Sequence, residues 1–145
     1  MKTNKMKSTL FLFVLCVLGT PSCDKSGGSD ADSIFLPDFS NDWSVVKGTP
    51  TGTFVINSTV TDSAKGMGTL QGQEFNDTAT YNLKGSFQNI QVTLGYLTNA
   101  ENGSDNGPRA GFTYKGIYDT TKKPTYFLRL LNVNNSGDSL VLKKG

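Results

Sequence analysis

Apolar and polar residues alternate along most of this chain. Ala79, Tyr81 and Leu83 share one face of their segment, while threonine, asparagine and lysine share the other. The segments 90–98 and 110–118 repeat this alternation. A period of two residues with one apolar face is typical of half-buried antiparallel β-strands. The pattern therefore predicts an all-β protein.

Short runs of turn-forming residues separate the alternating segments. The clearest are GTPTG at 48–52 and NNSGD at 134–138, since glycine, proline, asparagine and aspartate favour tight turns. Counting the segments between such runs predicts about eight strands. They cover residues 43–47, 53–61, 66–73, 78–85, 90–98, 110–118, 125–133 and 139–143.

Eight short strands joined by tight turns favour an antiparallel meander, and a meander of this size closes well into a barrel. Closure also removes the exposed strand edges that an open sheet would have to protect. We therefore predict an all-β, antiparallel barrel over residues 34–145. A β-sandwich is the alternative, because alternation looks the same in a closed barrel and in two packed sheets.

The start of the chain has the features of an export signal. Lys2, Lys5 and Lys7 precede an apolar run at residues 10–18. This run is too short to cross a bilayer as a helix, which needs about 20 apolar residues. A basic start, a short apolar stretch and small residues before a cleavage site are typical of a secretory signal. We expect residues 1–22 to be a signal peptide.

The end of this signal resembles that of bacterial lipoproteins, since the small residue Ser22 precedes Cys23. In that family the signal is cut before a cysteine, which then carries acyl chains such as palmitate. The resemblance implies that Cys23 is lipidated and that the protein is an envelope lipoprotein, with the outer membrane as its expected site, facing the periplasm or the surface. Thr20 and Pro21 depart from the family pattern. A plain secreted protein, in which Cys23 is incidental, is the alternative.

The chain after the signal begins with a polar segment and is nearly neutral. Residues 23–33 read CDKSGGSDADS and hold no large apolar side chain, so they are predicted to form a flexible tether. Removing the signal takes three of the 14 basic residues and leaves 11 against 12 acidic ones. A nearly neutral chain lacks the basic excess typical of nucleic-acid binding, so we expect no nucleic-acid partner.

Residues 40–145 resemble the small lipocalin-like barrels of bacterial lipoproteins in the number and spacing of their strands. Barrels of this type often close one end with a tryptophan on the first strand, stacked on a basic residue from a late strand. Trp43 is the only tryptophan and lies on the first predicted strand, and Arg129 interrupts an apolar late strand. The resemblance implies a cation–π contact between Trp43 and Arg129. Asn41 stands where the family has glycine.

Side chains that commonly carry catalysis are scarce. The chain has no histidine, and its only cysteine after the signal is Cys23. This removes the commonest general base, the usual nucleophile activation and the commonest metal ligand. The two glutamates, Glu74 and Glu101, fall in or beside polar turn-like segments. We expect no enzyme, no cofactor and no metal site. The polar connection 99–109 lacks the acidic density of a calcium loop, but loops of this kind commonly contact partners.

Two functions remain as hypotheses. The first is a barrel that holds a small apolar ligand in its interior or mouth, with Phe54, Tyr81, Leu94, Tyr96, Phe112 and Tyr114 lining the site. The second is a solid-core module that binds another envelope protein, for example as a hydrolase inhibitor. Tyr118, Phe127 and Leu131 discriminate between them. Outside the barrel they would mark a protein partner, and inside it they would shrink the cavity.

Aspartate followed by serine or threonine recurs five times, each time before a small or apolar residue or a threonine. The pattern is similar to the O-glycosylation signal of certain Gram-negative anaerobes. It implies sugars on Ser33, Ser63, Thr78, Thr120 and Ser139. Aspartate before serine or threonine also forms turns readily, so a purely structural explanation stays open.

Overall fold

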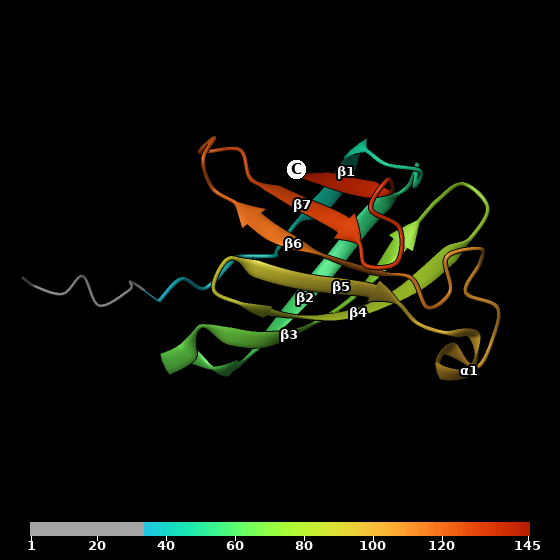
Figure 1. Ribbon diagram of the computed structural model, residues 1–145, viewed down its shortest axis with the longest axis horizontal. Coiled ribbons are helices and arrows are strands. Elements are labelled where there is room, and N and C mark those ends of the chain that lie inside the picture. Colours follow the sequence, from blue (N-terminus) through green and yellow to red (C-terminus); the bar gives the residue numbers. More distant parts are fainter. Residues whose placement is uncertain (1–33) are drawn as a thin grey trace, which may run out of the picture. The chain divides into compact units, whose positions relative to one another are not determined.

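The computed structural model describes residues 34–145, which form a closed eight-stranded antiparallel β-barrel (Figure 1). The strands follow one another around the barrel in chain order, and the last pairs with the first. They are β1 (Asp42–Lys47), β2 (Thr53–Asp62), β3 (Met67–Phe75), β4 (Thr80–Gln88), β5 (Gln91–Tyr96), β6 (Thr113–Asp119), β7 (Phe127–Asn132) and β8 (Ser139–Lys144). The predicted barrel is confirmed. A sandwich is excluded, because every strand pairs with two neighbours in one closed ring.

The expected signal peptide, Cys23, Ser33 and the tether lie outside the described residues. Within residues 34–145 the helical elements are η1 (Ser63–Lys65) and α1 (Asn99–Asn102), both in connections between strands. No helix of this part of the chain is long and apolar enough to span a membrane.

The sixth strand begins later than predicted. Before Thr113 the chain turns: the Ala110 N–H donates to the Gly107 carbonyl at 3.1 Å, and the Phe112 N–H donates to the Arg109 carbonyl at 2.8 Å. Phe112 therefore lies outside the sheet and is 40% exposed. Phe112 lies in the connection at the mouth and not on an inward face of β6, because this turn interrupts the alternation before Thr113.

The interior of the barrel is filled by its own side chains, which form one contiguous apolar core. Residues 34–145 contain no cysteine, so packing rather than a disulfide holds the fold together. The eight strands and the apolar core of the described residues belong to one compact unit. The largest fully buried residues are Phe39, Trp43, Phe54, Ile56, Leu70, Leu94, Tyr114, Tyr118, Leu128, Leu130, Leu140 and Leu142.

One end of the barrel, here called the closed end, is covered by residues 34–41. The Phe39 ring is fully buried, with its centroid 6.3 Å from that of Trp43 and 5.5 Å from that of Tyr118. The Trp43 indole N–H donates to the Phe39 carbonyl at 3.2 Å, and the Tyr118 hydroxyl donates to the Asp38 carbonyl at 2.9 Å. These contacts fix the segment as a plug.

The opposite end is here called the mouth. Because successive strands run in opposite directions, the connections β1–β2, β3–β4, β5–β6 and β7–β8 all lie there. The longest of them joins β5 to β6 over residues 97–112 and contains α1 (Figure 1). The four connections thus join all eight strands at the mouth.

Candidate functional site

A carboxylate lies inside the barrel near the mouth. Glu74, the second-last residue of β3, is fully buried and pairs with Phe54 of β2 on one side and Tyr81 of β4 on the other. The predicted strand ends at residue 73, which leaves Glu74 in a turn. The missed signal is the continued alternation, since Leu70 and Glu74 occupy the same inward register.

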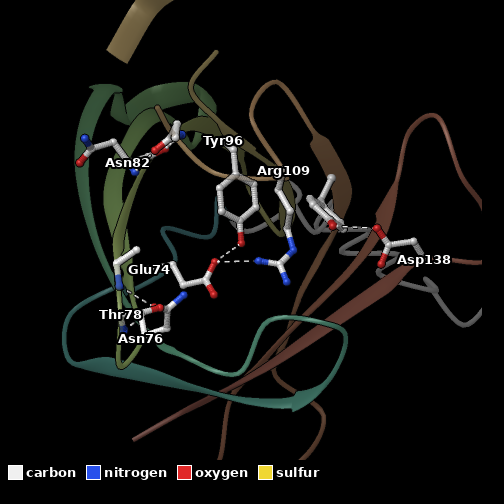
Figure 2. Close-up of polar contacts among 10 residues, drawn as sticks. Glu74, Asn76, Thr78, Asn82, Tyr96, Arg109 and Asp138 are labelled. Carbon is white, nitrogen blue, oxygen red and sulfur yellow. Dashed lines mark hydrogen bonds and ion pairs between the residues drawn. The ribbon is translucent and has the colours of Figure 1, made fainter. Parts of the chain in front are cut away.

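Two donors from distant parts of the chain reach the same oxygen of Glu74. The Tyr96 hydroxyl donates to Oε2, and a guanidinium nitrogen of Arg109 lies 3.4 Å from that atom (Figure 2). A buried carboxylate is costly unless it is paired and hydrogen-bonded, so these contacts offset its desolvation. Burial and the hydrogen bond to Glu74 together raise the pKa of Tyr96 above its ordinary value. Tyr96 therefore stays a neutral donor.

The second oxygen of Glu74 has no partner. Oε1 is buried and accepts no hydrogen bond from any described residue. An unsatisfied buried acceptor costs free energy and is uncommon in folded proteins. The site therefore has the capacity to accept one further hydrogen bond from a donor group.

Aromatic rings surround this carboxylate. The centroid of Tyr96 lies 6.4 Å from that of Tyr81 and 6.5 Å from that of Tyr114, both in edge-on arrangements. The Tyr114 hydroxyl donates to Asp138 at 2.8 Å, at the edge of the mouth (Figure 2). Burial, followed by this bond to Asp138, raises the pKa of Tyr114 to about 12. The tyrosine rings thus form an aromatic layer around the Glu74 carboxylate.

The connection between β5 and β6 brings Arg109 to this site because it is fastened to β4. The buried Asn106 side chain accepts from the Asn82 N–H at 2.7 Å and donates to the Asn82 and Leu97 carbonyls. A Cβ at Gly107 would lie 2.2 Å from the Tyr81 ring, so only glycine allows this close approach. The connection is an anchored loop rather than a free hairpin tip.

Glu101, an acidic residue of this loop, gives a testable pH dependence. Glu101 accepts from the Lys84 ammonium and from Thr98 in the capping box of α1, and these bonds lower its pKa to about 2. Folding lowers the pKa of Glu101, so its ionised form stabilises the folded protein. This contribution to stability is complete above the ordinary pKa of 4.5 and is lost as the pH falls through about 2.

We expect a carboxyl-resolved NMR titration of Glu101 to show a midpoint near the low value. The Lys84→Gln variant should move that midpoint up towards 4.5, because Lys84 is the largest cause of the shift. A midpoint of 4.5 in the unaltered protein would show that the Lys84 contact does not form in solution.

The structure brings most of the predicted ligand residues together. Phe54, Tyr96 and Tyr114 are buried in the layer around Glu74, and Tyr81 is half-buried against it. Leu94 is buried one inward position below Tyr96, deeper in the barrel. These residues pack against one another, so the interior leaves little free space beneath the mouth.

The predicted contact between Trp43 and Arg129 is wrong. Arg129 is on the outer face, because the residues before and after it point inward. Its Nε lies 2.6 Å from the Asp119 carboxylate and its guanidinium carbon 5.2 Å from the Phe127 ring centroid. Trp43 instead packs edge-on against Tyr118 at 5.9 Å.

The three discriminating residues divide between the two faces. Tyr118 is buried inside the barrel, Phe127 is half-buried, and Leu131 is 54% exposed on the outside. They do not form a single patch, so they leave both functional hypotheses open.

Four of the five possible acceptors of sugar are described. Ser63 and Thr78 are exposed, and Thr120 and Ser139 are partly buried. The Asp62 side chain accepts a hydrogen bond from the Lys65 N–H, and the Asp119 side chain accepts one from the Thr121 N–H. Such bonds are typical of turns that begin with aspartate. Glycosylation itself stays a prediction.

The larger hollows lie away from the aromatic layer. One of about 590 Å³ lies between the β1–β2 and β7–β8 connections, beside Lys47, Gly48 and Ser139. Another of about 540 Å³ lies on the outer face of β2 to β4, beside Gln71 and Asn82. Residues 34–145 contain no group of three or more acidic side chains that would hold a metal ion.

Comparison with known proteins adds no relative. No protein-family model matches this chain, and neither a curated protein nor a solved structure matches it. The fold defines its class: an eight-stranded antiparallel barrel of the lipocalin-like type, with a buried carboxylate near the mouth.

Proposed function

We propose that this chain is a lipid-anchored binding protein of the cell envelope, which takes a small, mainly apolar ligand at the mouth of its barrel. The observation that carries the proposal is the unpartnered Oε1 of Glu74, buried within a layer of aromatic rings. A ligand with an apolar body and one hydroxyl or amino group meets both features. The rings contact its body, and the carboxylate accepts a hydrogen bond from its polar group.

Entry of such a ligand requires part of the mouth to move. Arg109 lies in a turn between Gly107 and Gly111, which have φ values of 75° and 80°. Asn106 holds the loop before this turn, so a movement of the turn would leave the loop attached. The single long contact of Arg109 with Glu74 is weaker than a two-pronged ion pair and gives way more easily.

Native mass spectrometry of the chain purified from its own envelope extract tests the ligand proposal. We expect one additional small-molecule mass that disappears on denaturation. Glu74→Gln should weaken retention by at least about tenfold, since a hydrogen bond to a charged group contributes about 1.5–3 kcal/mol. Asp77→Asn, which removes an exposed carboxylate from the β3–β4 connection at the same mouth, is the control and should keep the ligand. A bare mass in every preparation would overturn the proposal.

The anchor has its own test. Acylation of Cys23 predicts that the mature chain begins at this residue and carries acyl chains, which its intact mass reports directly. Cys23→Ser should release the protein into the soluble envelope fraction. An unacylated mature chain would contradict the anchor and leave the ligand site unaffected.

The second candidate function is a solid-core module that binds another envelope protein, for example as a hydrolase inhibitor. It is favoured by the packed interior and by the exposure of Leu131 on the outer face. A protein that co-purifies with the chain, together with a bare small-molecule mass, would support it over the ligand proposal.

A further inference from the structure

The outer faces of β6, β7 and β8 combine basic and apolar side chains. Ile117 pairs with Arg129, which pairs with Val141, and Lys115 pairs with Leu131 in the next row. Directly paired residues of antiparallel strands point to the same face, so these side chains are neighbours. The basic wall, as we call this surface, consists of Lys115, Ile117, Arg129, Leu131, Val141 and Lys143, with Phe127 and the acidic Asp119 in the row of Lys143.

The wall exposes both kinds of side chain. Ile117 is 41% and Leu131 is 54% exposed, although both lie within a regular sheet. Arg129 is paired with Asp119, but Lys115 and Lys143 form no ion pair with any residue of 34–145. The wall therefore offers net positive charge around apolar side chains.

The opposite side of the barrel has a different character. The outer faces of β2, β3 and β4 carry uncharged amides such as Asn57, Gln71 and Gln73. The charged residues of these strands outside the barrel interior are Lys84, which is paired with Glu101, and Asp62, which is paired with Lys65. Within residues 34–145, the lysines without an ion pair are Lys47, Lys115, Lys122, Lys123 and Lys143, and none of them lies on β2, β3 or β4.

The start of the barrel segment lies at the closed end, next to the connection that joins the wall strands β6 and β7. The Phe35 ring centroid lies 5.7 Å from that of Tyr118 on β6, and Leu36 borders the same hollow as Lys123 in the β6–β7 connection. Ile34 and Leu36 are both largely exposed here. In Figure 1 this segment, in blue, enters near the same end as the β6–β7 connection.

We infer that the basic wall docks on a membrane surface with anionic lipid headgroups. The inference rests on the proposed lipid anchor for its place in the cell. Ile34 lies eleven positions after Cys23, and this stretch spans at most about 40 Å when extended, so the anchor keeps the wall close to the bilayer. The lysines face the headgroups, and Ile117 and Leu131 contact the apolar boundary below them.

Vesicle sedimentation of the segment 34–145 tests the wall without the anchor. We expect binding to vesicles of phosphatidylcholine with phosphatidylglycerol, weakening as salt is added, and none to pure phosphatidylcholine. Lys115→Gln with Lys143→Gln should weaken binding by at least about tenfold. Leu131→Ser should weaken it less.

The matched control is Lys65→Gln with Lys84→Gln, which removes the same charge from exposed positions off the wall. This variant should bind as the unaltered segment does. Equal loss in the two double variants, or retention by an acidic protein but not by anionic vesicles, would overturn the inference. Because the segment lacks Cys23, this result is independent of whether the cysteine is acylated.

Discussion

Replacing Trp43 with alanine is expected to lower the free energy of unfolding by about 3–5 kcal/mol. The indole is fully buried at the closed end, where it packs against Phe39 and Tyr118 and donates to the Phe39 carbonyl at 3.2 Å. The substitution leaves a large cavity and frees the plug formed by residues 34–41. A domain of this size has a total stability of about 5–15 kcal/mol, so the variant will be close to unfolding.

Urea denaturation followed by circular dichroism measures this effect, because Trp43 is the only tryptophan and its fluorescence is lost with it. Trp43→Phe keeps a ring in place but loses the hydrogen bond, so we expect an intermediate cost. Val46→Ala, at a 57% exposed neighbour, should change stability by no more than about 0.5 kcal/mol. An effect of Trp43→Ala as small as that of Val46→Ala would show that the closed end does not depend on the indole.

Gly116→Ala is expected to cost about 3 kcal/mol, at the upper end of the range for overpacking. Gly116 lies on β6 opposite Leu130 of β7. A Cβ there would lie 1.8 Å from the Arg129 carbonyl oxygen and 2.9 Å from the Leu130 Cα, both main-chain atoms. No side-chain rotation relieves this clash, so the two strands must separate locally.

Gly137→Ala is the matched control, because the nearest atom to its Cβ is the flexible Asn135 side chain at 3.3 Å. Thermal unfolding of both variants compares them directly, and we expect Gly137→Ala to stay within about 0.5 kcal/mol of the unaltered protein. Similar losses in the two variants would mean that β6 and β7 approach each other less closely than described. Separation of β6 and β7 in the Gly116→Ala variant would also disturb the basic wall, which includes both strands.

Strand prediction succeeded where the alternation is local and regular. The alternation of Ala79, Tyr81 and Leu83 predicted β4. For every strand, the predicted first and last residues differ from the observed ones by three positions at most. It failed at Phe112, where main-chain hydrogen bonds in a turn override the pattern of side chains. It also ended β3 one residue too early to place Glu74 inside the barrel.

The candidate site was harder to foresee than the fold. Four aromatic residues of the mouth were predicted because they lie on apolar faces of strands. The polar centre was missed because Tyr96 and Arg109 are 22 and 35 residues from Glu74. A carboxylate is tolerable inside only when such donors arrive, and spacing along one chain does not show which residues meet across a barrel.

By itself, the sequence determined the all-β class, the positions of the strands, and the expectation of an export signal before them. These depend on side-chain period and local turn chemistry, which neighbouring residues carry. Tertiary structure alone decided that Arg129 faces outward to Asp119, that residues 34–41 plug one end, and that Glu74 keeps one unpartnered oxygen. Each of these depends on contacts between strands far apart in the chain, which exist only once the barrel has closed.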